Sequence, residues 1–412
     1  MASANTTNLA NLLNYMLPRK LNEALYKNSR FVGMMKKTTD FLGTTKEVVV
    51  RYAPTSGGSA TFSDAQASKD ASQLARFHVI RKREYQLASI EGELFAAARG
   101  GDSSLGKAMD REIESCMNGF AQALAVGAWG GGGGVLGQIS AASVVTSNTI
   151  TLANPSDANN FEVNMQLELS PDQGITPPFA GRRGAPTQVK VTNVNRITGQ
   201  ITCSTPWNTI IGASTGDFIF RRGDYSVKPA GVRGWIPDVD PVPGDNWYGQ
   251  DRSPDVNRLA GIRFNAGGSF IREAITNAAA VAYNENAMPE TCWINPVTWG
   301  NLSNELGSAI QFQRQKIGDT KTGEWGFDSI RLYGAYGPID VIAEPKVPAT
   351  KFFLTTMADW ELASAGPCPQ FLDFGQFSRM LQEQNADGYE TRVGGYLNYI
   401  CNNPRNQVNG TF

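Results

Sequence analysis

The most constraining feature of this 412-residue sequence is a long apolar repeat that stops at five consecutive glycines. From Asp102 to about Trp129, apolar residues recur every three or four positions with charged residues between them, which predicts one amphipathic helix. At 1.5 Å per residue such a helix is about 37 Å long, which is long for one compact domain. The glycines Gly130 to Gly134 end the helix, because glycine is poorly suited to continue it. The chain is long enough for two or three folded parts around this rod.

The glycine run also fits a phosphate-binding pattern. Gly132, Gly134 and Gly137 match G-x-G-x-x-G, and Asp157 follows where a dinucleotide fold places an acid for the ribose. In such a fold the glycines follow a strand and open a helix, so that the helix N-terminus faces the phosphate. Here the predicted helix comes first and β-like segments follow. A flexible junction is therefore the main interpretation, and a dinucleotide-binding enzyme using Gly130 to Gly137 is a distant alternative.

Two β-like segments before the helix are separated by a long polar stretch. Thr45–Ala53 (TKEVVVRYA) and Leu74–Leu87 (LARFHVIRKREYQL) are β-like runs, and a loop rich in Ser, Ala and Gly lies between them. Such a loop cannot bury itself, which predicts a long hairpin that projects from the body and needs a partner to order its loop. A merely flexible surface loop is the alternative.

The segments after the glycines divide into two further parts. Between about 135 and 225 the sequence alternates like short strands bounded by turns, which predicts a small inserted β domain. A connector rich in Pro and Gly follows, and then helix and strand signals alternate, which predicts an α/β domain. Asn295 and Pro296 are expected at the N-cap and the first position of one of its helices. A long alternating strand, YETRVGGYLNYICNN, completes the pattern.

Charge and cysteine content exclude several classes of protein. A net charge of -1 and a sequence pI near 6.0 argue against a protein built mainly to coat nucleic acid. The segment through residue 47 is locally basic, however, and is a candidate for contact with an anionic partner; a solvated face is the commoner explanation. The five cysteines are scattered without C-x-x-C and fit buried apolar positions in a reducing compartment. No apolar run approaches the roughly 18 residues of a membrane span, so no membrane contact is expected.

The residues that could carry chemistry are isolated from one another. His78 is the only histidine, which removes nearly all histidine-based catalysis. Trp293 and Trp299 could stack on a base or a sugar, but core positions are the commoner use of such residues. A proline-rich stretch contains three acids, as a calcium loop does, but lacks the spacing and the closing Glu of such a loop; the acids are Asp238, Asp240 and Asp245. No catalytic, cofactor-binding or metal-binding residue is therefore predicted.

The order of these elements resembles a known family. Three local runs add to the resemblance, namely CWINPVTWGNLSNEL (Cys292–Leu306), GFDSIRLYGAYGPIDVIAEPKVPATKFFLTTM (Gly326–Met357) and ADGYETRVGGYLNYICNNPRNQ (Ala386–Gln407). Together they are similar to the major capsid protein of tailed double-stranded DNA bacteriophages, the Hong Kong 97 phage-type capsid fold. The resemblance implies an α+β chain divided into an N-terminal arm (1–44), an extended hairpin loop (45–101), the spine helix of a peripheral domain (102–129), an inserted β domain (130–227), an axial α/β domain with its connector (228–375) and a C-terminal strand that returns to the peripheral domain (376–412).

The resemblance also implies a structural function and no enzyme. The family's chains self-assemble into pentamers and hexamers that form the icosahedral shell of the virion around packaged double-stranded DNA. Expected partners are further copies of the chain, a separate scaffolding protein, a portal and a decoration protein, with assembly in the host cytoplasm and no cofactor. Lys69 is the only lysine between the two β-like segments of the hairpin, and nothing marks a cross-linking partner for it. The shell of a cellular encapsulin-type nanocompartment is the alternative, although such shells usually lack so large a β insert.

Overall fold

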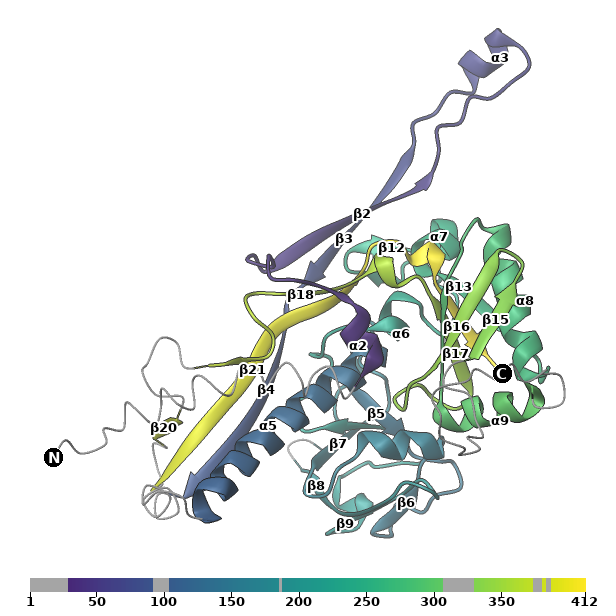
Figure 1. Ribbon diagram of the computed structural model, residues 1–412. Coiled ribbons are helices and arrows are strands. Elements are labelled where there is room, and N and C mark those ends of the chain that lie inside the picture. Colours follow the sequence, from purple (N-terminus) through teal and green to yellow (C-terminus); the bar gives the residue numbers. More distant parts are fainter. Residues whose placement is uncertain (1–28, 92–103, 185–186, 307–329, 373–379, 383–386) are drawn as a thin grey trace, which may run out of the picture.

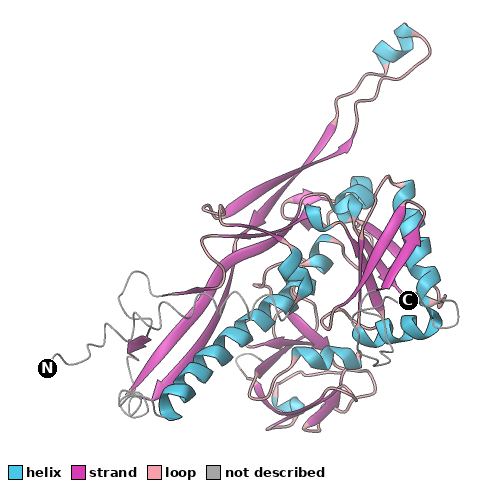
Figure 2. Cartoon of the chain, viewed as in Figure 1, coloured by secondary structure: helices cyan, strands magenta, loops and turns pink. Residues whose placement is uncertain are grey.

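The computed structural model describes residues 29–91, 104–184, 187–306, 330–372, 380–382 and 387–412. Figure 1 shows an elongated molecule in which a two-stranded ribbon projects from one end and a long sheet backed by a helix extends toward the other. Two further folded units lie beside the helix. Helices and strands are mixed throughout, as Figure 2 shows. The chain therefore has several parts around one rod.

The rod is α5 (Ser104–Trp129), a single helix of 26 residues, which confirms the helix predicted from the apolar repeat. It lies against a six-stranded sheet built on β21 (Gly388–Cys401). β4 (Lys82–Glu91) pairs antiparallel with β21, and β18 (Trp360–Ser364) lies beside the other part of β21. The sheet is completed by β1 (Lys36–Thr38), β19 (Gln370–Phe371) and β20 (Met380–Gln382). The apolar face of α5 is buried here through Ile113, Met117, Phe120 and Leu124.

A second six-stranded sheet forms the α/β unit. Its strand order is β13-β22-β17-β14-β16-β15, from β13 (Ile262–Asn265), β22 (Val408–Thr411), β17 (Lys351–Thr355), β14 (Thr291–Ile294), β16 (Gly337–Ala343) and β15 (Ile330–Gly334). The helices α8 (Ile271–Asn284) and α9 (Pro296–Leu306) pack against it, and α7 (Val256–Ala260) precedes it. Asn295 caps α9, because its Oδ1 accepts a hydrogen bond of 3.0 Å from the backbone N–H of Val297. This capping prediction is confirmed.

A third unit, rich in short strands, follows the glycines. Its sheet has the order β5-β10-β7-β8-β9-β6, from β5 (Val135–Gln138), β10 (Phe218–Arg221), β7 (Gln166–Ser170), β8 (Val189–Asn195), β9 (Gln200–Cys203) and β6 (Thr149–Thr151). It has a hydrophobic core of its own, in which Phe161, Leu167, Trp207 and Ile219 are fully buried. The strand-rich segment predicted between about 135 and 225 is therefore present.

One predicted strand is two strands in the structure. The segment Leu74–Leu87 was expected to be one strand, but it covers most of β3 (Gln73–Ile80) and the first part of β4, with Arg81 between them. β3 pairs with β2 (Thr45–Ala53), whereas β4 pairs with β21 in the long sheet. Four charged residues in a row, Arg81 to Glu84, interrupt the alternation of apolar and polar residues here, and the expectation of one strand overlooked this break.

The end of the described chain also differs from its prediction. The segment 376–412 was expected to return as one strand to the sheet beside the helix. β21 does so, but the chain then passes through a short 3-10 turn (Pro404–Asn406) and adds β22 to the other sheet, between β13 and β17. β22 has only four residues, and its central Asn-Gly pair is a composition more typical of turns than of strands.

The five glycines after α5 are a packed crossing, and the expectation of a flexible junction is wrong. A Cβ atom added at Gly133 would lie 1.8 Å from the carbonyl oxygen of Gln173, and one at Gly134 would lie 2.5 Å from that of Asp224. The carbonyl of Gly133 also accepts a hydrogen bond from Ser226 N–H at 2.8 Å. At these two positions the backbones therefore approach too closely for any side chain, which explains Gly133 and Gly134 without flexibility.

Candidate functional site: the projecting hairpin and its root

Residues that could have formed a small-molecule site are dispersed over the molecule. His78 lies on the exposed face of β3, with its Nδ1 3.5 Å from a Glu47 oxygen. Trp293 is fully buried in the core and donates to Thr355 Oγ1 at 2.8 Å. Asp238 contacts Lys351 at 2.7 Å and Arg233. Among the described residues, no group of three or more His, Cys, Asp or Glu side chains is arranged to hold a metal ion.

The glycine pattern does not build a phosphate site. α5 precedes the glycines and strand β5 follows them, which is the reverse of the order in a dinucleotide fold. Asp157 lies in a 3-10 turn (Pro155–Asn160), where burial raises its pKa to about 6 against the opposing effect of Arg233. A cavity of about 720 Å³ lies beside the glycines, but it is lined by acids as well as by Arg233 and Lys346.

No described helix is both long enough and apolar enough to span a bilayer. None of the five cysteines forms a disulfide; four are buried and Cys368 is half-buried. Burial raises the pKa of the Cys203 thiol to about 12. The scattered cysteines therefore lie where small apolar residues do, as predicted.

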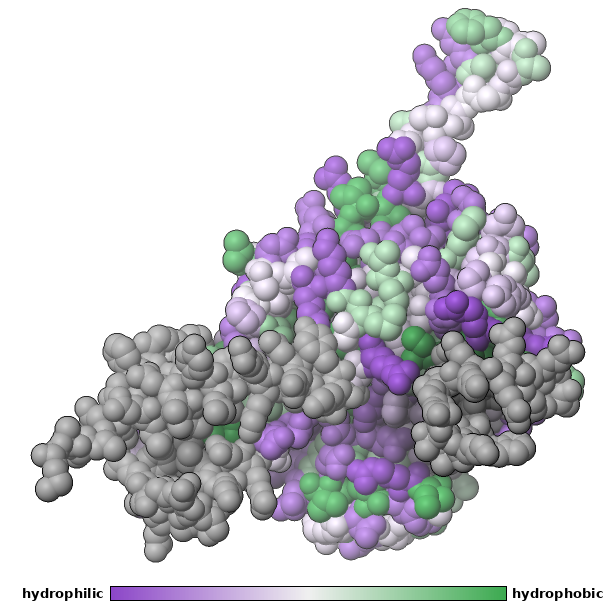
Figure 3. Space-filling model, viewed as in Figure 1, coloured by the Kyte–Doolittle hydropathy of each residue, from purple (hydrophilic) through white to green (hydrophobic). Residues whose placement is uncertain are grey.

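The most distinctive feature of the molecule is the ribbon formed by β2 and β3. Figure 3 shows its tip standing clear of the body. No residue from Arg51 through Leu74 is buried, and the side chain of Phe62, at the start of α3 (Phe62–Ala67) in the tip, is 82% exposed. A hairpin of this length gains no burial from its own chain beyond its root, so its apolar residues are available only to another molecule.

The root of the ribbon, by contrast, is packed on the body with one face. Val48 and Val50 of β2 and Ala75, Phe77 and Val79 of β3 are buried, in strict alternation with exposed neighbours. Phe77 makes an edge-to-face contact with the ring of Trp235, with centroids 5.5 Å apart. The opposite face remains open and carries Val49, Leu74 and Ile80, each about half exposed.

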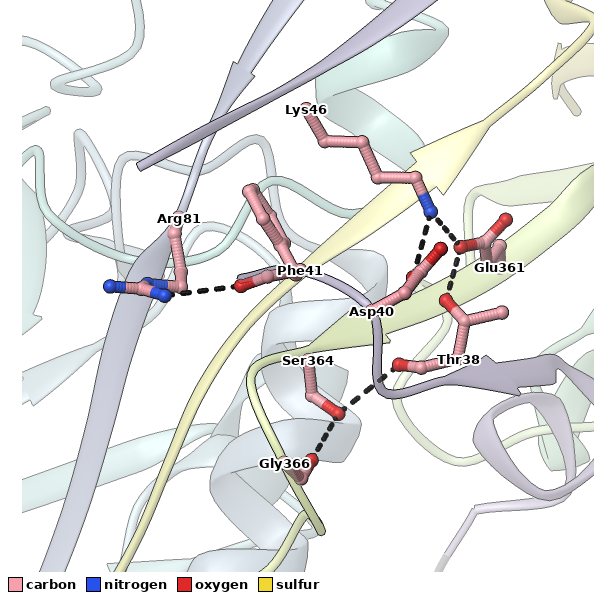
Figure 4. Close-up of polar contacts among 8 residues, drawn as sticks. All are labelled: Thr38, Asp40, Phe41, Lys46, Arg81, Glu361, Ser364 and Gly366. Carbon is pink, nitrogen blue, oxygen red and sulfur yellow. Dashed lines mark hydrogen bonds and ion pairs between the residues drawn. The ribbon is translucent and has the colours of Figure 1, made fainter. Parts of the chain in front are cut away.

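A polar network fixes the start of the ribbon, as Figure 4 shows. β1 pairs in parallel with β18, and Glu361 of β18 accepts from both Thr38 Oγ1 and Lys46 Nζ, the latter at 2.5 Å. Lys46 also contacts Asp40 at 3.3 Å. Burial opposes the positive charge of Lys46, yet its hydrogen bonds and charge interactions with Glu361 and Asp40 raise its pKa. The ammonium in turn lowers the pKa of Asp40. One lysine therefore joins the ribbon to the strand beneath it.

Arg81 occupies the point where β3 becomes β4. Its guanidinium donates to the carbonyl of Phe41 at 3.1 Å (Figure 4) and to that of Leu42 at 3.3 Å. It also lies over the ring of Tyr396, at 5.8 Å from the ring centroid. Its backbone N–H donates to Thr44 O at 2.9 Å. Arg81 therefore joins the base of the ribbon to residues 41–44, at the point where pairing with β2 ends and pairing with β21 begins.

The side chain of Asn398 in β21 is buried under this junction and makes four hydrogen bonds. Its Nδ2 donates to Ile80 O at 2.7 Å and to the Tyr248 hydroxyl at 2.8 Å. Its Oδ1 accepts from the backbone N–H groups of Ala230 and Tyr399, both at 2.9 Å. A fully used amide of this kind fixes three segments of the chain in one arrangement, because each lost contact would leave a buried polar group unpaired.

A last set of contacts holds the outer part of the root. Backbone N–H groups of β3 donate to Tyr248 O from His78 (2.9 Å) and to Gln250 Oε1 from Arg76 (3.2 Å). On the other strand, Arg258 donates to Tyr52 O at 2.6 Å. Among the described residues, hydrogen bonds from the body to β2 therefore extend along the strand as far as Tyr52.

Sequence reasoning located the ribbon but missed its supports. Lys46 and Glu361 are 315 positions apart, and Asn398 lies 318 positions from Ile80, so no local pattern links them. Lys69 lies in the exposed tip, as expected of a loop lysine. The basic residues before residue 29 lie outside the described part of the chain.

Comparisons with known proteins found similarity to solved structures. No family model matches the chain, and no curated protein matches it. Among solved structures, the Cyanophage A-1(L) capsid is 9% identical over 89% of this chain and 87% of that chain, with a TM-score of 0.49. The capsid of a native GTA particle is 10% identical over 94% and 90%, with a TM-score of 0.45. The procapsid of satellite phage P4 is 9% identical over 100% and 98%, with a TM-score of 0.36. The structural neighbours of this chain are capsid proteins of tailed phages and phage-like particles.

Proposed function

We propose that this chain is the major capsid protein of a tailed double-stranded DNA phage, which assembles into the pentamers and hexamers of an icosahedral shell around the viral genome. The observation that carries the proposal is the β2–β3 ribbon. It is anchored firmly at its root, extends beyond the body and buries none of its outer residues in its own chain. A second copy of the chain is the partner that such a ribbon requires in a homomeric shell.

The physical reason is the area that a shell must bury. Obligate assemblies bury thousands of Å² for each subunit, more than the flat side of a compact domain provides. A ribbon that crosses onto a neighbour adds its two faces to that area. Exposed apolar side chains are distributed along it for this use, namely Leu42 and Val49 near the root, Leu74 on the outer face and Phe62 at the tip.

The proposal assigns the parts of the chain as the family resemblance implies. Residues 1–44 are the N-terminal arm, 45–101 the extended loop, 102–129 the spine helix, 130–227 the β insert, 228–375 the axial domain with its connector and 376–412 the returning C-terminal segment. The element boundaries above refine this scheme at β4 and β22. Partners are further copies of the chain, a scaffolding protein, a portal and a decoration protein, with DNA on the inner face of the virion.

Deleting the tip tests the proposal. Joining residue 55 directly to residue 73 removes Ser56 to Ser72, which contribute no buried residue, so the subunit should keep its fold and fail to close shells. Circular dichroism and thermal unfolding establish the fold, and sedimentation with electron microscopy counts the particles. Ile197→Ser, on an exposed turn of the β unit, is the matched control and should assemble normally. Normal particles from the deletion would overturn the proposal.

The contents of the particles distinguish the two kinds of shell. A phage capsid encloses DNA when it is produced during infection, whereas a nanocompartment shell of the same architecture holds cargo protein. Nuclease-protected DNA of uniform length in purified particles supports the proposal. Particles that retain a defined protein cargo and no DNA would favour the nanocompartment.

A further inference from the structure

We infer that the cavity beside the packed glycine crossing binds a small molecule through an oxyanion, a phosphate or a carboxylate group, with Arg252 as the principal ligand. The site lies within one subunit and does not depend on the proposed function. Three observations carry it, namely a buried guanidinium with two unused N–H groups, a second cation in the same wall, and nearby acids that are neutralised by other partners.

The cavity lies where the end of α5, the β unit and the segment leading to α7 meet. Its wall includes Trp129 of α5, Asp157 of the β unit, and Arg233 and Arg252 of the segment before α7. Its volume of about 720 Å³ falls within the range of about 300 to 1,000 Å³ that is usual for small-molecule sites. The charged groups are side chains, so this site differs from a dinucleotide fold, in which backbone N–H groups bind the phosphate.

Arg252 is a buried cation held in a fixed orientation. Only 3% of the residue is exposed, and its Nη1 donates to Gly234 O at 3.0 Å and to Trp235 O at 3.2 Å. Its Cζ lies 5.0 Å from the centroid of the Trp247 ring. Among the described residues no carboxylate forms an ion pair with Arg252, and burial lowers its pKa only to about 10. The side chain is therefore charged at neutral pH without a counterion, which is unfavourable for a buried charge.

The unused N–H groups of Arg252 are those with which other arginines of this chain bind carboxylates. Arg183 contacts both oxygens of Asp217, through Nε at 3.0 Å and Nη2 at 2.8 Å, and Arg331 contacts Asp340 through the same two atoms. In Arg252 the Nε is buried without a partner, and Nη2 makes no hydrogen bond within the described part of the chain. This planar pair of donors matches two oxygens of a carboxylate or a phosphate, and it therefore selects an oxyanion.

Two other groups of the wall also favour an anion. Lys346 Nζ donates to Asn159 O at 2.6 Å and forms no ion pair with a described carboxylate. Burial lowers the pKa of Lys346 to about 8, which leaves it mostly charged at neutral pH. The indole Nε1 of Trp129 is buried and has no acceptor among the residues that the structure describes. Two cations without counterions and an unused donor therefore belong to one wall.

Two acids of the same wall are neutralised by cations of their own. Asp238 pairs with Lys351 at 2.7 Å and with Arg233, and Asp240 pairs with Arg263. Since these carboxylates have partners, they do not supply the counterion that Arg252 lacks.

The remaining acids oppose an anion only weakly or in a reversible way. Asp172 accepts hydrogen bonds from nearby N–H and O–H groups, and Asp245 is half exposed to solvent. Asp157 is the main opponent, but burial raises its pKa to about 6 against the effect of Arg233. It can therefore take up a proton more easily than an ordinary carboxylate when an anion enters the cavity.

Isothermal titration calorimetry on unassembled subunits tests the site, with inorganic phosphate and citrate as the two probes. Saturable binding of either probe supports the inference, and the tighter one identifies the preferred group. Arg252→Gln removes the charge and the unused N–H pair and should weaken binding by about tenfold or more. Arg331→Gln, which removes an exposed arginine, is the matched control and should bind as the parent does. No saturable binding of either probe to the parent, or equal affinities of the parent and Arg252→Gln, would overturn the inference.

A substitution that should improve binding separates a lost ligand from a distorted wall. Asp157→Asn removes the acid that opposes an anion, so phosphate should bind about threefold more tightly than to the parent. Damage to the wall does not produce such a gain. An affinity equal to or below that of the parent would contradict an oxyanion in this cavity. Neither titration requires a shell, so the result is independent of the test of the capsid function.

Discussion

The glycine run after α5 and the loop at the tip of the projecting ribbon are alike in sequence and differ in their surroundings. Both are rich in small residues, and both were expected to be flexible. At Gly133 and Gly134 the chain lies so close to the carbonyl oxygens of Gln173 and Asp224 that no side chain fits. At the tip of the ribbon, a Cβ atom added to Gly58 would meet nothing within 4 Å. The first segment is enclosed by neighbouring backbone, whereas Gly58 has open space around it.

The comparison shows what small residues do and do not reveal. Glycine permits both a close backbone approach and a wide range of conformations, and only the neighbouring atoms decide which property is used. Those neighbours are distant in sequence. Gln173, which contacts Gly133, comes from a loop forty positions later, and Asp224, which contacts Gly134, follows the last strand of the β unit.

The largest expected effect is on the packed crossing. Gly133→Ala would place a methyl group against the Gln173 carbonyl, where the available distance is 1.8 Å, so the backbones must separate. We expect a loss of about 4 kcal/mol in the free energy of unfolding, or no folded protein, at the upper end of single-substitution effects. Urea unfolding or the soluble yield measures it. A variant within 1 kcal/mol of the parent, on the order of an ordinary surface change, would mean that the crossing adapts easily.

The next effect concerns the ion pair between Lys228, which lies beside the glycine crossing, and Glu84 of β4 in the long sheet. Lys228 Nζ lies 2.5 Å from Glu84 Oε2 and 3.1 Å from Asp224 Oδ2, and both Lys228 and Glu84 are largely buried. Lys228→Met leaves the Glu84 carboxylate buried without its partner, at a cost of about 3 kcal/mol at neutral pH. Replacing both, with Glu84→Leu and Lys228→Met, should cost less than the single change.

This effect depends on pH in a direction that follows from Glu84. Burial raises the pKa of its carboxyl even beside Lys228, and removing the ammonium raises it further. A carboxyl with a higher pKa in the folded than in the unfolded state adds stability as pH falls through the folded value. The deficit of Lys228→Met should therefore shrink between pH 7 and pH 5. A deficit that is constant over this range would assign the loss to packing and not to the buried charge.

A smaller effect is expected at the root of the ribbon. Asn398→Ala removes four hydrogen bonds and leaves the N–H of Ala230 and the carbonyl of Ile80 without these partners, which should cost about 2 kcal/mol. Hydrogen exchange should rise between Ala75 and Ile80 of β3, where pairing with β2 protects the parent. Asn402→Ala, at an exposed position, is the control. Unchanged exchange in β3 would show that the stability of the root does not depend on Asn398.

The smallest effect is expected in the ribbon itself. Gly58→Ala meets no atom within 4 Å and restricts the unfolded chain, so it should change stability by no more than about 0.5 kcal/mol, in the stabilising direction. Thermal unfolding of Gly58→Ala beside Gly133→Ala tests the comparison in one experiment. Equal losses from both substitutions would refute it.

Local patterns were sufficient for the regular elements. The apolar repeat predicted α5 to within two residues of its start, and Asn295 with Pro296 predicted the beginning of α9. Periodicity succeeded because burial on one face of a helix or strand repeats along the chain. The β-like composition of TKEVVVRYA correctly predicted β2, and the polar loop after it correctly predicted a projecting hairpin.

Contacts between distant segments could not be predicted in the same way. The charged run from Arg81 to Glu84 interrupts the pattern of residues 74 to 87, but it does not indicate which strand each part pairs with. Nothing near Lys46 indicates Glu361, and a short strand such as β22 is too brief to show a period. These features depend on which segments meet after folding, and that information is not present in any one window of sequence.

β22 has a consequence for how the protein is made. It lies inside its sheet, paired in parallel with β13 and antiparallel with β17. β13 pairs with no other described strand, so a ribosome must translate everything from residue 266 to residue 411 before β13 can join the sheet. During that interval the nascent α/β unit presents the unpaired edge of β17, which other strands could occupy. Copies translated close together on one messenger RNA therefore depend on rapid arrival of β22 to avoid pairing with one another.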